Sequence, residues 1–294
     1  MELRHLRYFI AVAEELHFYR AAERLHIDQS PLSRAIKELE SELGTQLLIR
    51  DTRGTRLTWA GQVFLEDARR IINSVEQAKR NAAAAATGFR GTLRVALSDG
   101  ISPTRLATLL AQCREEEPEV DIRLSEVSLS EQLKGLRDDL FDVGFARSNE
   151  VGDGMLAAVA WEDPIVLATP PRHPLLKHKQ IPLAEALDFP LVLCDPVVFE
   201  GCHRQMERIL RTVDIEPIVA DYVSTQGVMV ALVSAGYGVG FTCDVMANHA
   251  GIVSRPIAGD AYRLTTYLLR QDGNISPQLE RFVERACAND SAGT

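Results

Sequence analysis

The stretch HFYRAAERLHIDQSPLSRAIKELESEL, residues 17–43, decides the fold of the N-terminal part of this chain. Apolar residues recur at helical spacing in its first and last thirds, and this spacing predicts two short helices. A polar turn at residues 26–30 separates them. Ser30 has the residue type of an N-cap, and Pro31 suits a first helical position because proline has no N–H to leave unpaired there. We therefore expect the second helix to begin at Ser30–Pro31.

The outward face near the start of this second helix carries polar and basic side chains. They are Gln29, Ser30, Ser33, Arg34 and Lys37. Such side chains at the start of a helix can reach base edges and phosphates in a major groove. The pattern indicates a helix-turn-helix that reads double-stranded DNA. The alternative is an ordinary helical hairpin with a solvated face, because short motifs also match by chance.

A β-hairpin is predicted directly after Gly44. Apolar residues 47–49 form its first strand, Gly54 lies in its turn and residues 56–58 return. Three arginines lie on or beside it, namely Arg50, Arg53 and Arg56. A hairpin next to a reading helix is a wing whose arginines contact the flanking phosphates. A solvated basic turn is the alternative.

Two further helices complete the N-terminal part. Residues 3–16 form a first helix that closes the small core, and Thr58 caps a long helix over residues 59–88. The long helix spaces apolar residues alternately four and three apart, which is a heptad pattern. The expected dimerisation positions are Phe64, Ala68, Ile71, Val75, Ala78 and Ala82. About 30 helical residues span about 45 Å, so we expect pairing with a second copy, as a homodimer or a dimer of dimers.

The net charge of −9 is distributed unevenly. Residues 1–90 hold 14 Lys+Arg and 12 Asp+Glu. The rest of the chain holds 18 Lys+Arg and 29 Asp+Glu. A mildly basic part joined to an acidic one fits a DNA-binding unit attached to a domain that does not touch DNA.

Composition excludes several other classes. No apolar run approaches the roughly 18 residues of a membrane span, and the charged N-terminus lacks the features of a signal peptide, so we expect a cytoplasmic protein. The five cysteines form no CxxC pair, and therefore neither a metal site nor a disulfide framework is expected. No cofactor is predicted.

From residue 91 onward, strand and helix patterns alternate, which predicts a parallel sheet covered by helices. A capping box, Ser128 with Glu131, opens one of the helices. A second unit starting at residue 162 repeats the scheme, and residues 263–288 return to the first unit. The expected domains are 1–58, 59–88 and 91–294, the last divided into subdomain I (91–161 and 265–294) and subdomain II (162–264).

Residues 1–88 resemble the DNA-binding half of LysR-type transcriptional regulators. The segments that carry the resemblance are LRYFIAVAEE, FYRAAERLHIDQSPLSRAIKELE and LGTQLLIRDTRGTRLTWAG, and the layout of the rest of the chain matches too. His17, Asp28 and Leu48 depart from the usual pattern. Asp28 would repel a phosphate, so an N-capping role is assigned to it.

The resemblance implies a specific architecture. This is an N-terminal all-α winged helix-turn-helix plus a long linker helix, followed by a C-terminal α/β regulatory domain of two periplasmic-binding-protein-like subdomains. It also implies a regulator that binds DNA, a small-molecule effector (often a small organic acid) and RNA polymerase.

Ligands of open α/β sheets bind beyond the carboxyl ends of the strands. The residues expected there are Ser98, Asp99, Gly100, Ser102, Ser128, Arg147, Cys202, His203, Thr225, Gln226 and Phe241. Helix N-termini at Ser102 and Ser128 suit an anion, and Arg147 suits a carboxylate. The alternatives are plain helix capping by the two serines and an interdomain ion pair for Arg147.

Thiol-based sensing, enzymatic catalysis and solute binding are the other functions to consider for this sequence. Cys202 lies near the position used by peroxide-sensing members of the family and Cys194 eight residues before it, so thiol-based redox sensing is the alternative function. An enzyme is disfavoured because no GxSxG, HExxH or P-loop pattern occurs in a suitable context, and no catalytic residue is predicted. A solute-binding module would be exported, which the N-terminus contradicts.

Overall fold

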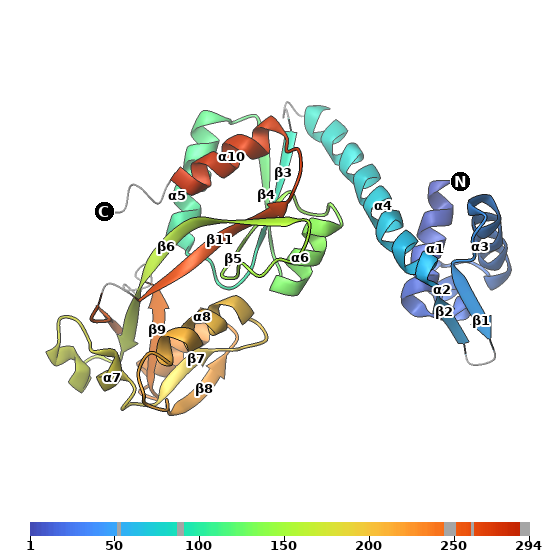
Figure 1. Ribbon diagram of the computed structural model, residues 1–294. Coiled ribbons are helices and arrows are strands. Elements are labelled where there is room, and N and C mark those ends of the chain that lie inside the picture. Colours follow the sequence, from blue (N-terminus) through green and yellow to red (C-terminus); the bar gives the residue numbers. More distant parts are fainter. Residues whose placement is uncertain (52–53, 87–90, 244–250, 260–261, 289–294) are drawn as a thin grey trace. The chain divides into compact units, whose positions relative to one another are not determined.

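The computed structural model describes residues 1–51, 54–86, 91–243, 251–259 and 262–288 (Figure 1). The chain divides into two compact units. One comprises Met1–Thr87 with Asp138–Leu140, and the other comprises Gly88–Arg137 and Phe141–Thr294. Within the described ranges, none of the helices has both the length and the apolar character needed to span a bilayer.

The N-terminal unit is a helical core with a hairpin beside it. Its elements are α1 (Leu3–Glu15), α2 (Phe18–Leu25), α3 (Gln29–Leu43), β1 (Leu48–Asp51), β2 (Gly54–Leu57) and α4 (Trp59–Ala86). Phe9, Leu32 and Ile36 are fully buried at its centre. The adjacent Ala21 and Ala22 of α2 are buried as well, because their small side chains admit the neighbouring helices closely. The helix-turn-helix, the hairpin and the long helix are thus confirmed.

The start of α3 differs from the sequence expectation. The helix begins at Gln29, and Asp28 rather than Ser30 occupies the N-cap position, although its side chain makes no capping hydrogen bond. Pro31 lies inside the first turn. Proline is tolerated there because the first N–H groups of a helix have no intrahelical partner.

The hairpin is fixed to α3 and α4 by hydrogen bonds. Glu40 Oε1 accepts from the N–H groups of Leu47 and Leu48, at 2.9 Å and 3.0 Å. At the start of α4, Thr58 N donates to the Leu47 carbonyl oxygen at 2.9 Å, and Thr58 Oγ1 caps the helix by accepting from Gly61 N at 2.9 Å. A Cβ on Gly61 would lie 2.1 Å from the Leu47 carbonyl oxygen, so only glycine lets α4 approach β1 this closely.

The heptad positions of α4 divide into two groups. Phe64 packs against Phe9 with the two rings tilted and their centroids 5.3 Å apart, and Ala68 is fully buried in the core of its own unit. Ala68 therefore cannot lie on a subunit surface, which corrects the expectation for that residue. Further along the helix, Ile71 is exposed and Val75 half-buried. Ala78 and Ala82 are also exposed.

The C-terminal unit contains one nine-stranded sheet of order β4-β3-β5-β11-β6-β9-β7-β8, with β10 beside β6. Its strands are β3 (Gly91–Leu97), β4 (Val120–Glu126), β5 (Val143–Ala146), β6 (Met155–Thr169), β7 (Leu191–Cys194), β8 (Val219–Val223), β9 (Val239–Cys243), β10 (Val253–Pro256) and β11 (Arg263–Gln271). Its helices are α5 (Pro103–Glu116), α6 (Leu129–Arg137), α7 (Leu183–Ala186), α8 (Glu200–Leu210), α9 (Gln226–Ser234) and α10 (Pro277–Ala288), with a 3-10 turn at Pro174–Lys177.

Two long strands join the two halves of this sheet. β6 pairs with β11 over Met155–Pro164 and with β9 over Ile165–Ala168. Figure 1 shows β6 and β11 running from the half that holds β3–β5 to the half that holds β7–β9. Parallel pairs form within each half, β3 with β4 and β5 in one and β7 with β8 and β9 in the other. The two-subdomain architecture, with two crossings of the chain, is confirmed.

Candidate nucleic-acid interface and regulatory cleft

The first half of α3 presents a polar surface. Its inner side chains Leu32, Ala35 and Ile36 are buried in the core, which leaves the opposite face to solvent. Gln29, Ser30, Arg34 and Lys37 are exposed there, and Ser33 is half-buried. Among the residues that the structure describes, the Arg34 and Lys37 side chains make no hydrogen bond or ion pair.

The arginines of α2 are neutralised within the chain. Arg24 pairs with Glu14 at 2.8 Å, and Arg20 pairs with Glu15 at 3.7 Å. Burial would raise the pKa of Glu14, but Arg69 and Arg24 together hold that pKa below its ordinary value. Among the described residues of α2 and α3, the positive charges without an acidic partner are therefore those of Arg34 and Lys37 on α3.

The wing contributes one arginine that contacts α2 and α3. Arg50 Nη1 donates to Ser33 Oγ at 2.9 Å, and the guanidinium lies 4.1 Å from the Phe18 ring centroid. Arg56 is exposed on β2. Arg53 lies outside the described residues.

A small cavity of about 50 Å³ lies between the two subdomains of the C-terminal unit. It is lined by seven of the residues expected to bind an effector, namely Asp99, Gly100, Arg147, Cys202, Thr225, Gln226 and Phe241. The other lining residues, which the sequence did not indicate, are Cys194, Phe199, Val223, Met229, Thr242, Cys243 and Leu264. Most of these residues lie at strand ends or in loops, or have apolar side chains. Their sequence pattern is the same as that of ordinary core residues, so it gives no sign of a binding site.

Four expected effector residues do not line this cavity, and two of them are buried serines. Ser98 Oγ donates to Gln132 Oε1 at 2.7 Å, and Gln132 Nε2 donates to the Ala96 and Phe145 carbonyl oxygens at 3.1 Å. Through Gln132, Ser98 thus links α6 to the strands β3 and β5 within subdomain I. Ser102 precedes α5 and is buried, and its hydroxyl has no partner within the described ranges.

Ser128 and His203 also lie elsewhere. Ser128 forms the predicted capping box, since its N–H donates to Glu131 Oε2 at 3.0 Å and its Oγ accepts from Glu131 N at 3.3 Å. The Ser128 hydroxyl lowers the pKa of Glu131. His203 Nδ1 lies 3.2 Å from the Cys194 carbonyl oxygen. The capping interpretation of Ser128 fits this geometry, and His203 is tied to the strand end.

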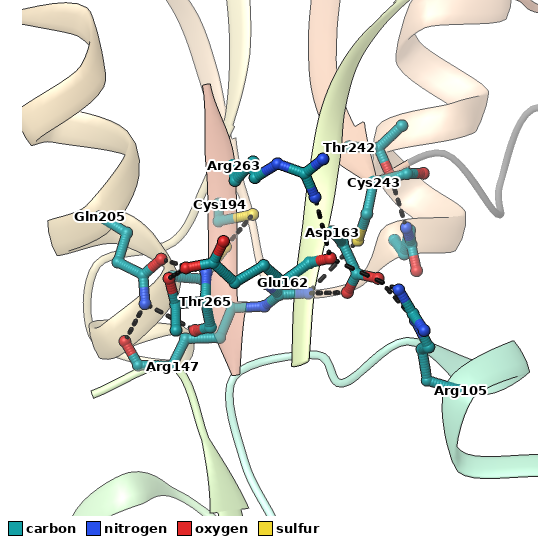
Figure 2. Close-up of polar contacts among 12 residues, drawn as sticks. Arg105, Arg147, Glu162, Asp163, Cys194, Gln205, Thr242, Cys243, Arg263 and Thr265 are labelled. Atoms are coloured by element: carbon teal, nitrogen blue, oxygen red, sulfur yellow. Dashed lines mark hydrogen bonds and ion pairs between the residues drawn. The ribbon is translucent and has the colours of Figure 1, made fainter. Parts of the chain in front are cut away.

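Arg147 is the central charged group of the cleft (Figure 2). It is 1% exposed. Its Nη2 lies 3.7 Å from Asp163 Oδ2 and donates to Cys243 Sγ at 3.3 Å. Nε and Nη1 have no hydrogen-bond partner in the part of the chain that the structure covers. Burial by itself lowers the pKa of Arg147. The Cys243 and Cys202 sulfurs and the neighbouring carboxylates have the larger combined effect, so the pKa of Arg147 lies above its usual value.

Asp99 faces Arg147 from the end of β3. Its carboxylate accepts from Gly201 N at 2.8 Å and from Arg147 N at 3.2 Å. Gly201 belongs to the first turn of α8, in subdomain II. A single carboxylate of subdomain I therefore joins both halves of the sheet.

Two thiols also meet in the cleft. Cys202 Sγ lies 4.0 Å from Cys194 Sγ. The hydrogen bond that Cys202 donates lowers the pKa of Cys194, while the same bond and burial raise the pKa of Cys202. In the described ranges, no group of three or more His, Cys, Asp or Glu side chains is placed to hold a metal ion.

A winged helix-turn-helix joined to a two-lobed domain with a buried polar cleft defines a ligand-responsive DNA-binding regulator. Residues 3–62 match the family described as "Bacterial regulatory helix-turn-helix protein, lysR family", and residues 86–289 match the "LysR substrate binding domain". This chain belongs to the LysR family of transcriptional regulators. It is a DNA-binding regulator with an effector-binding domain, and not an enzyme.

Individual relatives agree with this placement. The chain is 37% identical over 240 residues to the uncharacterized regulator YnfL of Escherichia coli, covering 81% of each chain. It is 34% identical over 241 residues to AlsR of Bacillus subtilis, covering 82% of this chain and 80% of AlsR. The solved structure of CbnR, a LysR family regulator, superposes with a TM-score of 0.70 at 29% identity, covering 99% of both chains. CbnR bound to its target DNA superposes equally well, at 30% identity and over 97% of this chain and 99% of CbnR.

Proposed function

We propose that this regulator reads its operator with the first half of α3 and places its wing on the flanking backbone. The observation that carries the proposal is the pair Arg34 and Lys37, which are exposed on α3 while the arginines of α2 are neutralised by glutamates. Gln29, Ser30 and Ser33 would contact base edges, and Arg50, Arg53 and Arg56 would contact phosphates. Such a protein acts in the cytoplasm, where it meets DNA and RNA polymerase.

The test is a gel shift of the full chain with the intergenic region upstream of its own gene. A retarded band that weakens steeply as salt rises is expected, because binding releases condensed counterions. Unrelated DNA of equal length is the control. Equal binding to both DNAs at every salt concentration contradicts the assignment of α3 as a sequence reader.

We further propose that α4 pairs with a second copy through Ile71, Val75, Ala78 and Ala82, with Phe64 at the edge of the contact. Apolar side chains at heptad positions need a partner helix, and Ile71, Ala78 and Ala82 are exposed in the single chain. The pairing would hold two reading heads at the spacing of a twofold operator.

The effector site we propose is the cleft around Arg147, Cys202, Thr225, Gln226 and Phe241. A cavity of about 50 Å³ holds a few water molecules, whereas sites for organic ligands measure about 300–1,000 Å³. The cleft must therefore open when the effector enters. A thermal-shift screen of the full chain against metabolites tests this proposal. A ligand whose stabilising effect is unchanged in Gln226→Ala and Phe241→Ala variants binds elsewhere.

Thiol-based sensing is a second candidate, favoured by the 4.0 Å separation of Cys194 Sγ and Cys202 Sγ. A peroxide would take two electrons and two protons from the two thiols, which would form one S–S bond and two water molecules. Peptide mapping of the full chain after peroxide treatment should recover a Cys194–Cys202 linked peptide. Cys113→Ser, in subdomain I, is the control, and absence of the linked peptide rejects this candidate.

A further inference from the structure

The loop after β3 places a carboxylate in an uncommon backbone conformation. Asp99 has φ 60° and Gly100 has φ 64°, which lie in the left-handed region that most side chains avoid. Asp99 is 3% exposed. This turn directs the Asp99 side chain across the cleft to Gly201 N in α8, at 2.8 Å.

The position that the Asp99 carboxylate occupies has the properties of an anion site. The first N–H groups of a helix have no intrahelical partner, and the helix dipole makes that end positive. Gly201 leaves the space for an oxygen atom, since a Cβ there would lie 2.6 Å from Asp99 Oδ2 and 2.8 Å from the Arg147 carbonyl carbon. Arg147, whose Nε and Nη1 are unpartnered among described residues, lines the same cavity.

The charges around the cavity are already balanced. Arg147 and Asp99 both belong to the cavity lining. Outside the lining, the Asp163 carboxylate lies 3.7 Å from Arg147 Nη2 and 3.3 Å from Arg105 Nε. The lining of the cavity thus holds one positive side chain, Arg147, and one negative side chain, Asp99, among the described residues, which leaves no net positive charge for a further carboxylate. An added anion could accept hydrogen bonds from Arg147 Nε and Nη1, but together with Asp99 it would place a net negative charge in a buried site, which is unfavourable.

We propose that Asp99 is a built-in ligand of the cleft. Its carboxylate fills the anion site at the start of α8 and holds the two subdomains closed without an effector, so the effector of this protein is uncharged where it meets Arg147. This inference rests on the proposed function of the cleft as the effector site. It distinguishes this chain from a regulator whose effector supplies the carboxylate itself.

Chemical rescue tests the proposal on the full chain. Asp99→Gly removes the carboxylate and keeps a residue that accepts a positive φ. Formate is the probe, at constant ionic strength, with formamide as the uncharged comparison. Formate should raise the melting temperature of the Asp99→Gly protein by about 3 °C and leave the wild-type melting temperature unchanged.

Asp195→Gly is the matched control. Asp195 Oδ1 also accepts from two backbone N–H groups, those of Val197 and Val198, but it does so in a surface turn outside the cavity. No formate rescue is expected there. Rescue of Asp99→Gly no greater than that of Asp195→Gly overturns the proposal, as does equal stabilisation of the wild type.

A second variant decides the matter if Asp99→Gly does not fold. Asp99→Asn keeps the shape and the tolerance of positive φ but loses the charge. The Gly201 amide hydrogen should then exchange with solvent about tenfold faster, and an unchanged rate overturns the proposal. A gel shift of the wild type is independent of these results, so loss of operator binding would reject the proposed function and leave the role of Asp99 standing.

Discussion

Arg50 Nη1 donates a hydrogen bond to Ser33 Oγ across 2.9 Å, so the wing and the reading helix are joined by their own proposed DNA contacts. The same guanidinium lies over the Phe18 ring of α2. Because one side chain touches both neighbouring helices, the wing arginine is held in place before DNA arrives. Preorganisation of this kind reduces the entropy lost on binding.

Arg50→Ala should weaken operator binding and reduce the slope of log affinity against log salt by about 1, as expected for the loss of one phosphate contact. Ser33→Ala should weaken binding while leaving the salt slope unchanged, since no charge is removed. Titrations of each variant at four salt concentrations check this. An unchanged slope for Arg50→Ala would remove Arg50 from the phosphate contacts.

Arg34→Ala should lower operator affinity by about tenfold or more, because Arg34 is exposed on α3 and unpaired in the described part of the chain. Arg20→Ala is the matched control. It removes an exposed arginine of α2 that Glu15 already neutralises, so its affinity should change little. Both variants should keep the wild-type circular dichroism spectrum, and equal losses of affinity would argue against a special role for α3.

Ala82→Glu should weaken self-association, since it places a charge on the proposed seam of α4. Ala83→Glu makes the same change one position further along the helix, outside the heptad pattern. Both alanines are exposed in the single chain, so neither change should unfold it. Sedimentation equilibrium measures the association constant, and equal effects of the two substitutions would reject the seam.

Gly201→Ala should destabilise the C-terminal unit, although alanine normally favours a helix over glycine by about 1 kcal/mol. The added Cβ would meet Asp99 Oδ2 at 2.6 Å and the Arg147 backbone at 2.8 Å, and the backbone cannot move away easily. Gly227→Ala, in the first turn of α9, is the control because nothing lies within 4 Å of its Cβ. Melting temperatures should fall for the first variant and stay level or rise for the second.

Acid should destabilise the contact between α5 and α10. Burial would raise the pKa of Glu117, but Arg281 and Arg285 hold that pKa below its ordinary value of 4.5. A carboxyl whose folded-state pKa is lowered contributes stability above the unfolded-state value and loses it as the pH falls through the folded-state value. Glu117→Gln should therefore lower the free energy of unfolding at pH 7, and the difference from wild type should shrink below pH 4.5. A difference that persists unchanged at low pH would contradict this.

Local signals in the sequence predicted most elements well. The capping box of Ser128 and Glu131 depends on residues three apart, and both hydrogen bonds form. The last helix, Pro277–Ala288, lies within residues 263–288, which the sequence assigns to the return of the chain to the first unit. The predicted start of α3 was wrong because Asp28 and Ser30 both have residue types that suit an N-cap, and Asp28 is the one that occupies this position.

Long-range contacts limited the prediction of the cleft. Ser98 and Asp99 are adjacent in sequence and their side chains are hydrogen-bonded to each other, yet Ser98 also binds Gln132 of its own subdomain, whereas Asp99 reaches Gly201 in α8. Cys243 joins the cavity only because β9 lies beside β6 in the sheet. The role of Phe64 likewise depends on α1, whose Phe9 takes up one end of the heptad pattern.

The strand β6 runs without interruption from Met155 to Thr169 through both subdomains, and β11 accompanies it to Arg263. A hinge made of loops would let the lobes swing freely, whereas a hydrogen-bonded ribbon stores elastic energy when it is twisted. The pairing of β11 with β6 shifts by one residue between Thr266 and Tyr267, and a bulge of this kind bends and twists a strand locally. Because the effector would have to open the cleft, elastic recoil of this twisted backbone ribbon would return the cleft to its closed state when the effector leaves.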